Sequence, residues 1–216
     1  MSVEPFVFRT EARLVVLTGR RARNLPELLE QLIQVSGSCI FYHTHYLYLV
    51  QHFVKPRFYN DFANWASHSL QEERLAEQLA AIDLLAITSI RELRESIIAT
   101  LRKHLERLPN MNRECRTGDE FHFCEAKSFI MTAGPVANDP AEFFEQIPKV
   151  SNACIHFHCF EARLRLEKTT NDFSQWLAAV GESSLAKKID RLNPYVMTLD
   201  ELKMSIAKLG RGHLRK

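Results

Sequence analysis

The sequence predicts a mostly α protein made of two tandem, pseudo-symmetric helical repeats with short β strands at the start of each repeat; the alternative is an all-α fold. Two observations predict this fold class. Residues of the segment Glu30–His43 recur in the same order in Glu145–His158. The segment Asn60–Trp65 recurs in the same way as Asn171–Trp176. Equivalent segments of a repeat adopt equivalent structures, so the duplication fixes much of the architecture.

The two copies align as residues 4–108 and 119–213. Residues 109–118 between them contain proline, glycine, asparagine and several charges, which is the composition of a linker. We expect the two repeats to pack together as one globular body.

Each copy opens with a pattern typical of β strands. Alternating aromatic residues stand at Phe6-x-Phe8 and at Phe121-x-Phe123, and apolar runs follow each pair. Both runs stop near a glycine, Gly19 in the first copy and Gly134 in the second. The pattern predicts one short strand per copy that ends at this glycine.

The segment that carries the histidines is ambiguous in the first copy alone. Cys39–Val50 is rich in isoleucine, phenylalanine, tyrosine and valine, which favour a buried strand. The equivalent region of the second copy contains Glu161–Glu167, which consists of strong helix formers. Since equivalent segments share a fold, we predict that both are helices.

Capping residues predict where the remaining helices begin. Asn24 and Asp139 precede prolines that suit a first helical turn, and Asp61 and Asp172 precede apolar helical stretches. Three capping boxes follow, at Ser69-x-x-Glu72, Ser89-x-x-Glu92 and Thr198-x-x-Glu201. Each opens a predicted helix with one apolar face.

Composition narrows the class of protein. The chain has 216 residues, 46% of them hydrophobic and 25% charged, which is ordinary for a globular protein. A net charge of +2 gives no reason to expect a membrane or nucleic acid as partner, so a small molecule or a protein is expected, and homo-oligomers are left open. The start of the chain lacks the features of a signal peptide, and its five cysteines are an odd number, which predicts reduced thiols in the cytoplasm.

The repeated motifs resemble those of a family of unknown function. Phe41–His45 with Asn60–Trp65 is similar to the first half of an uncharacterised bacterial and archaeal domain family, and His156–Leu166 with Asn171–Trp176 is similar to its second half. The resemblance covers nearly the whole chain. It implies a cytoplasmic prokaryotic protein and no particular activity.

The paired histidines suggest a metal site. Two residues apart on a helix, the rings of His43 and His45, or of His156 and His158, point away from each other and do not chelate one ion. A site would therefore need His43 and His158 to meet across a pseudo-twofold axis.

Carboxylates would complete such a site, and Glu11 and Glu125 stand at positions that we take to be equivalent. Glu161 and the cation Arg163 are further candidates for residues of this site. The alternative for the histidines is a structural role in the core, where a neighbour accepts or donates a hydrogen bond.

Other residues have a structural and a chemical interpretation. Asp61 and Asp172 suit acid–base catalysis or metal binding, but helix capping is the favoured interpretation. Cys39 and Cys154 lie in apolar runs, where packing is the default, and Cys154 with His158 at helical spacing is the nucleophile alternative.

An anion site is a separate alternative. Gly19 with Arg20 and Arg21 precedes a predicted helix start, which resembles a phosphate cradle in outline. The second copy lacks both arginines, so such a site would exist in the first copy only.

These observations favour a non-enzymatic binding or regulatory module without a cofactor. A metal-assisted hydrolase with a divalent ion between His43 and His158 is the first alternative. A protein that binds a small anionic ligand is the second.

Overall fold

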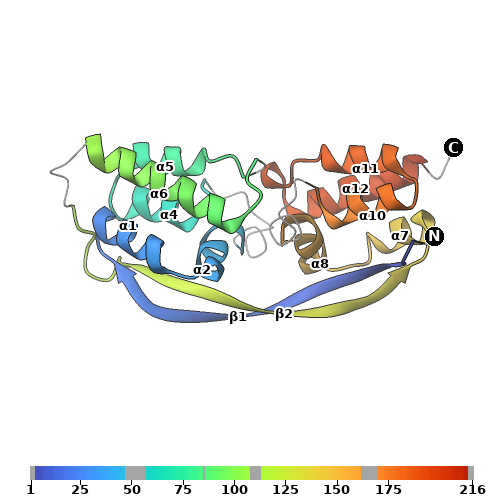
Figure 1. The fold of residues 1–216 in the computed structure, drawn as a ribbon, viewed down its shortest axis with the longest axis horizontal. Coiled ribbons are helices and arrows are strands. Elements are labelled where there is room, and N and C mark those ends of the chain that lie inside the picture. The colour runs from blue at the N-terminus through green and yellow to red at the C-terminus, as the bar shows by residue number, and fades with distance from the viewer. Residues whose placement is uncertain (1–2, 47–56, 85, 108–112, 162–169, 214–216) are drawn as a thin grey trace. The chain divides into compact units, whose positions relative to one another are not determined.

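The computed structural model describes residues 3–46, 57–84, 86–107, 113–161 and 170–213, and these are mostly helical, as predicted (Figure 1). The first part contains β1 (Phe6–Ala22), α1 (Leu25–Gln34), α2 (Gly37–Phe41), the π-helix η1 (Tyr42–Tyr46), α4 (Asp61–His68), α5 (Glu73–Ala80) and α6 (Ile90–Arg107). The second part contains β2 (Phe121–Ala137), α7 (Pro140–Gln146), α8 (Asn152–His156), the π-helix η2 (Phe157–Glu161), α10 (Asp172–Ala179), α11 (Ser183–Asp190), the 3₁₀ helix η3 (Pro194–Val196) and α12 (Leu199–His213).

The strands are longer than the sequence predicted. β1 and β2 have 17 residues each and form a two-stranded antiparallel sheet. Gly19 and Gly134 do not end them but lie inside them with φ angles of 77° and 98°. A glycine adopts this left-handed backbone without steric cost, so the strand bends there and continues.

The chain forms two compact units, and neither is a continuous stretch of sequence. The first unit lies within residues 13–47 and 56–127, and the second lies within residues 1–12 and 128–216. Each unit therefore contains the start of one strand, the end of the other strand and one set of helices.

The start of each strand packs against helices that follow the other strand in the sequence. In the second unit, the Phe6 ring lies 5.3 Å from that of Phe143 and 5.6 Å from that of Trp176. In the first unit, the Phe121 ring lies 5.1 Å from that of Phe62 and 5.8 Å from that of Trp65. The aromatic pairs that open the two copies are thus exchanged between them.

The tryptophans also fix the strands through the backbone. Trp65 donates its indole N–H to the carbonyl of Asp119 at 2.7 Å, and Trp176 donates to the carbonyl of Glu4 at 2.9 Å. Both carbonyls lie two residues before a strand, so each indole holds the segment that leads into the sheet.

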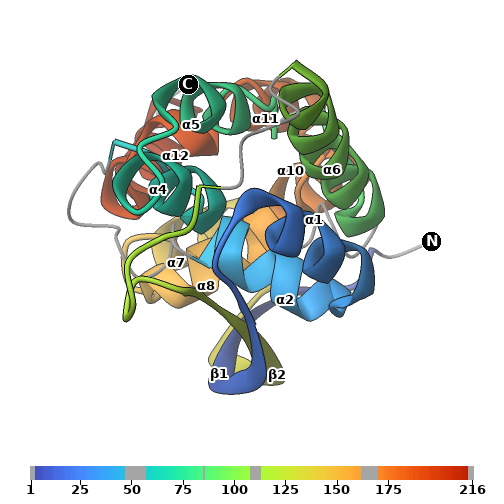
Figure 2. The same cartoon turned by 90° about the vertical axis from the view of Figure 1, so that its left-hand side faces the viewer.

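The helices of the first unit form layers because each helix buries its apolar face. Figure 2 faces this unit, where α1 and α2 lie between the strands and the layer of α4, α5 and α6. The predicted stripe of α6 is buried, with Leu93, Ile97 and Leu101 at most 1% exposed.

In the second unit, α12 approaches α7 very closely. A Cβ atom placed on Gly210 would lie 2.2 Å from the ring of the buried Phe144. Gly210 is therefore required by packing, whereas a Cβ on Gly212, in the same helix, would meet nothing within 4 Å.

Some of the predicted caps are present and others are not. Asn24 and Asp139 accept from the amides of Glu27 and Glu142, both at 2.9 Å. At the start of α12, Thr198 and Glu201 form both hydrogen bonds of a capping box. The box predicted at Ser69-x-x-Glu72 is wrong: α5 begins at Glu73 without a side-chain cap. The carboxylate of Glu72 is buried instead, 3.2 Å from the His104 imidazole.

The described part of the predicted linker contacts the first unit. The amide of Cys115 donates to the carbonyl of Arg23 at 2.8 Å, and the Arg113 guanidinium donates to the carbonyl of Leu70 at 3.0 Å. Residues 108–112 lie outside the described residues. The bounds 4–108 and 119–213 and the packing of the repeats as one body stay predictions.

Candidate functional site

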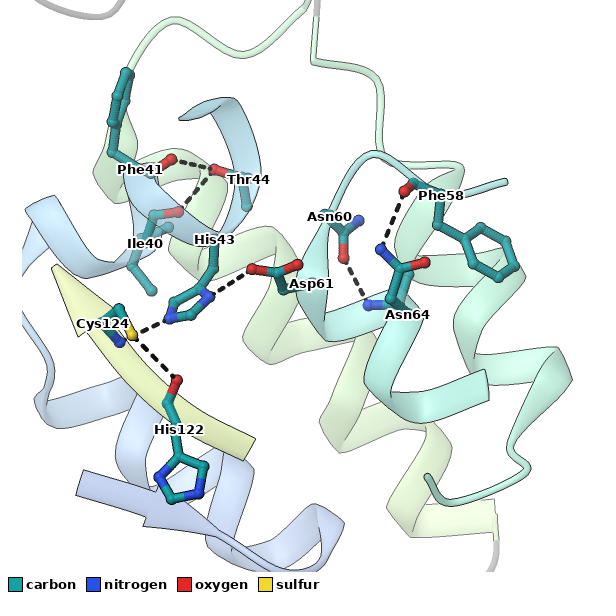
Figure 3. A network of polar contacts seen from close by, with 11 residues as sticks. Ile40, Phe41, His43, Thr44, Phe58, Asn60, Asp61, Asn64, His122 and Cys124 are labelled. Carbon is teal, nitrogen blue, oxygen red and sulfur yellow. Dashed lines mark hydrogen bonds and ion pairs between the residues drawn. The ribbon is translucent and has the colours of Figure 1, made fainter. Parts of the chain in front are cut away.

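His43 in the first unit joins a helix to a strand (Figure 3). The ring is 3% exposed and lies in η1. Its Nδ1 lies 2.8 Å from Oδ2 of Asp61, at the first position of α4. Its Nε2 lies 2.9 Å from the backbone nitrogen of Cys124 in β2.

His158 in the second unit makes the same pair of contacts. The ring is 2% exposed, and its Nδ1 lies 2.8 Å from Oδ2 of Asp172, at the start of α10. Its Nε2 accepts from the backbone N–H of Arg9 in β1 at 2.9 Å.

These contacts assign the tautomer of both histidines. A backbone N–H only donates, so each Nε2 must present its lone pair. The proton of each neutral ring is then on Nδ1 and is donated to the carboxylate. Both nitrogens are in use, and a metal ion at Nε2 would have to displace a strand amide.

The aspartates reach the histidines because another residue caps each helix. We predicted Asp61 and Asp172 as N-caps, and this is wrong. The N-caps are Asn60, which accepts from the amide of Ala63 at 2.7 Å, and Asn171, which accepts from the amide of Ser174 at 2.9 Å. An asparagine cap leaves the next carboxylate free to turn toward the imidazole.

The other histidine of each motif, His45 or His156, has different surroundings. His45 stacks on Phe41 with ring centres 5.4 Å apart, and its Nδ1 lies 2.9 Å from Oγ1 of Thr44. His156 stacks on Phe160 at 5.0 Å. His43 and His45 thus contact different neighbours, as the helical geometry predicted.

Glu11 and Glu125 are not equivalent, contrary to our alignment. When Phe6 and Phe8 are aligned with Phe121 and Phe123, Glu11 aligns with Ala126, and Glu125 aligns with Thr10. Our alignment of the two glutamates was therefore wrong by one residue. Glu11 and Ala126 are both buried. The Glu11 carboxylate lies 3.9 Å from Nδ1 of His156, whereas Glu125 accepts from the hydroxyl of Ser36 at 2.8 Å.

The predicted anion cradle does not have the required backbone. Gly19, Arg20 and Arg21 lie within β1, not in a loop before a helix. The Arg20 guanidinium donates to the side-chain oxygens of Gln31 and Gln34, both at 2.8 Å. It therefore fixes the strand to α1.

Two further candidates are placed only in part. Glu161 is the last residue of η2. Arg163 lies outside the described residues.

The cysteines of the apolar runs are poor nucleophiles. Burial raises the pKa of the thiols of both Cys39 and Cys154 to about 12. Burial, followed by the Asp61 carboxylate, also raises the pKa of Cys124, whose thiol donates to the carbonyl of His122 at 3.8 Å (Figure 3).

We expect alkylation to report these pKa values. Thiolate reacts and thiol does not, so a raised pKa means slow reaction below it. With iodoacetamide at pH 8, Cys39 and Cys154 should stay unmodified in the folded chain, while the partly exposed Cys124 reacts first. Peptide mass spectrometry over a pH series checks this, with urea-unfolded protein as control. Rapid native modification of Cys154 at pH 8 would contradict the assignment.

An open cleft of about 510 Å³ lies beside the His158–Asp172 pair in the second unit. Residues 3–7 and Arg9, at the start of β1, form one wall, and Gln175, Trp176 and Ala179 of α10 form the other. Within the described chain, the side chains of Glu4, Arg9 and Gln175 form no hydrogen bond or ion pair. These groups are available to a ligand.

The model of a family of unknown function, DUF5752, matches residues 3–211. The chain belongs to the DUF5752 family. This confirms the predicted resemblance to an uncharacterised domain family. Among solved structures, this DUF5752 chain is similar to OrfY from Thermoproteus tenax, with a TM-score of 0.82 and 26% identity over 98% of this chain and 97% of that one. A search of curated proteins gives no match.

Two structural searches bear on this DUF5752 protein. In the described ranges, no three histidine, cysteine or carboxylate side chains are grouped so that they could hold a metal ion. None of the helices in those ranges is both long and apolar enough to cross a bilayer.

Sequence reasoning did not identify the cleft of this DUF5752 protein. Arg9 and Gln175 have no equivalent in the other copy, where Cys124 and Asn64 stand. Our comparison of the copies identified Arg20 and Arg21 as unmatched, but not these residues. Because side chains alternate along a strand, Arg9 lies on the side opposite to Phe6 and Phe8. The position of Arg9 could have been predicted from this alternation.

Proposed function

We propose that this DUF5752 protein is a non-enzymatic binding module whose His–Asp pairs are structural. One observation carries the proposal: both nitrogens of each imidazole are committed, one to a strand amide and one to a carboxylate. A general base or a metal ligand needs a nitrogen that is available to the substrate or the ion.

The cleft beside His158 is the proposed binding site. It combines apolar surface, from Phe6 on one wall and Trp176 on the other, with the polar side chains of Glu4, Arg9 and Gln175. A concave surface with a few convergent polar groups is the usual form of a ligand site. We also propose a cytoplasmic location, which the five free cysteines support.

Metal analysis separates this proposal from a metal-assisted hydrolase. The full chain, purified without chelator, should contain no stoichiometric metal by plasma mass spectrometry. One zinc, iron or manganese ion per chain that is lost in a His43→Phe/His158→Phe variant would overturn the proposal.

Thermal unfolding in the presence of sugars, nucleotides, phosphates and amino acids tests binding. A ligand that binds only the folded state raises the melting temperature. At least one compound should raise it in the wild type and not in Ala179→Trp, which fills the cleft. Ala99→Trp, at an exposed position of α6, is the control. A shift that is equal in Ala179→Trp and in the wild type would place the site elsewhere.

A further inference from the structure

In the second unit, His158 occupies part of the edge of β1 that faces away from β2. Backbone N–H and C=O groups of successive residues alternate between the two edges of a strand. The N–H of Arg9 donates to His158, so this amide points away from β2. The imidazole therefore blocks the edge at Arg9.

Two residues earlier, the backbone of Val7 points to the same edge. The sheet has only the strands β1 and β2 in the described part of the chain, so no third strand covers Val7 there. Val7 lines the cleft that separates β1 from α10. An unpaired strand edge beside a cleft is a template for another extended chain.

The charges at the two ends of the cleft have opposite signs. Glu4 lies near the start of the wall that β1 provides, and Arg9 lies at its other end. Neither side chain forms an ion pair within the described residues. Phe6 and the largely buried Trp176, which is 8% exposed, provide apolar surface between them.

We propose that this cleft binds an extended peptide segment that adds to β1 at Val7, with an acidic residue at Arg9 and a basic residue at Glu4. Glu4 and Arg9 are five positions apart. Five steps are about 16 Å of strand, so a segment that reaches both charges has about six residues. Antiparallel pairing is the more stable arrangement, and it places the acidic residue at the amino end of the peptide. An apolar central side chain meets Phe6 and Trp176. The inference rests on the proposed binding function.

The matching position in the first unit differs. There the thiol of Cys124 donates to the carbonyl of His122, the residue that corresponds to Val7. Cys124 also replaces Arg9, so that edge lacks the cation. Peptide binding is therefore assigned to the second unit, and β2 supplies a matched control.

Fluorescence anisotropy with blocked, labelled hexapeptides tests the proposal on the full chain. The probes are Glu-Val-Val-Phe-Val-Lys, the reversed order Lys-Val-Phe-Val-Val-Glu, and versions with two acidic or two basic ends. The first should bind about tenfold more tightly than the others, since each of the others places at least one like-charge pair in the cleft. The charge swap Glu4→Lys/Arg9→Glu should reverse the preference between the first two peptides.

Two proline variants test the backbone contact. Val7→Pro removes an N–H that points away from β2, so the sheet ladder is retained and peptide binding is lost. His122→Pro makes the same change on β2 and should leave binding unaltered. Circular dichroism checks the fold of each variant, and if Val7→Pro does not fold, the charge swap decides.

Failure of this inference is distinct from failure of the binding function. Absence of binding by every peptide, or an unchanged preference in the charge swap, overturns peptide addition. If a small molecule still raises the melting temperature of the wild type but not of Ala179→Trp, the binding function stands without it.

Discussion

Replacing His158 with phenylalanine should lower the free energy of unfolding by about 2–4 kcal/mol. The ring volume is kept, but the amide of Arg9 and the carboxylate of Asp172 each lose a hydrogen-bond partner in a partly buried place. A buried polar group without a partner keeps its full desolvation cost. Denaturant titration followed by circular dichroism measures the change.

The matched variants show whether the effect belongs to the His–Asp pair. His43→Phe, which makes the same change in the first unit, should cost a similar amount, whereas His68→Phe, at an exposed position, should change stability by less than about 0.5 kcal/mol. In a cycle with Asp172→Asn, the two changes should not add, because they remove the same contact. Full additivity would show that the imidazole and the carboxylate act independently.

Gly210→Ala should destabilise the protein by about 1–3 kcal/mol. The new Cβ would lie 2.2 Å from the Phe144 ring, so α12 or the ring has to move within a packed core. Thermal and denaturant unfolding measure the loss.

Gly212→Ala is the control in the same helix. A Cβ there meets nothing within 4 Å, and alanine is the better helix former, so stability should rise by up to about 1 kcal/mol. Equal effects of the two substitutions would mean that helix propensity, not the contact with Phe144, determines the outcome.

Local patterns predicted most of the helices because their causes are local. The caps Asn24 and Asp139 and the stripe on α6 depend on residues three or four positions apart, and these were found. Equivalence of the copies also correctly resolved the segment around His43 as helical. Where two capping residues stand side by side, as at Asn60 and Asp61, sequence alone did not show which one turns inward.

Contacts between residues far apart in the sequence could not be predicted from such local patterns. Nothing in the sequence near Phe6 indicates that it packs against Trp176. The burial of Glu11 depends on which side of a bent strand it occupies, and a one-residue error in alignment paired it with Glu125, which is not buried. Arg9 reaches the cleft because of the same placement of the strand, so the cleft was not predicted either.

The exchange of strand starts constrains how the chain can fold during synthesis. A ribosome that has completed α6 has made every helix of the first unit described here, yet not Phe121 and Phe123, which complete its core. Phe6 and Phe8 emerge first but must wait for Phe143 and Trp176, over a hundred residues later. Such long sequence separations slow folding. A gene cut at residue 108 would therefore yield two fragments that each lack part of their own core and regain it only by association.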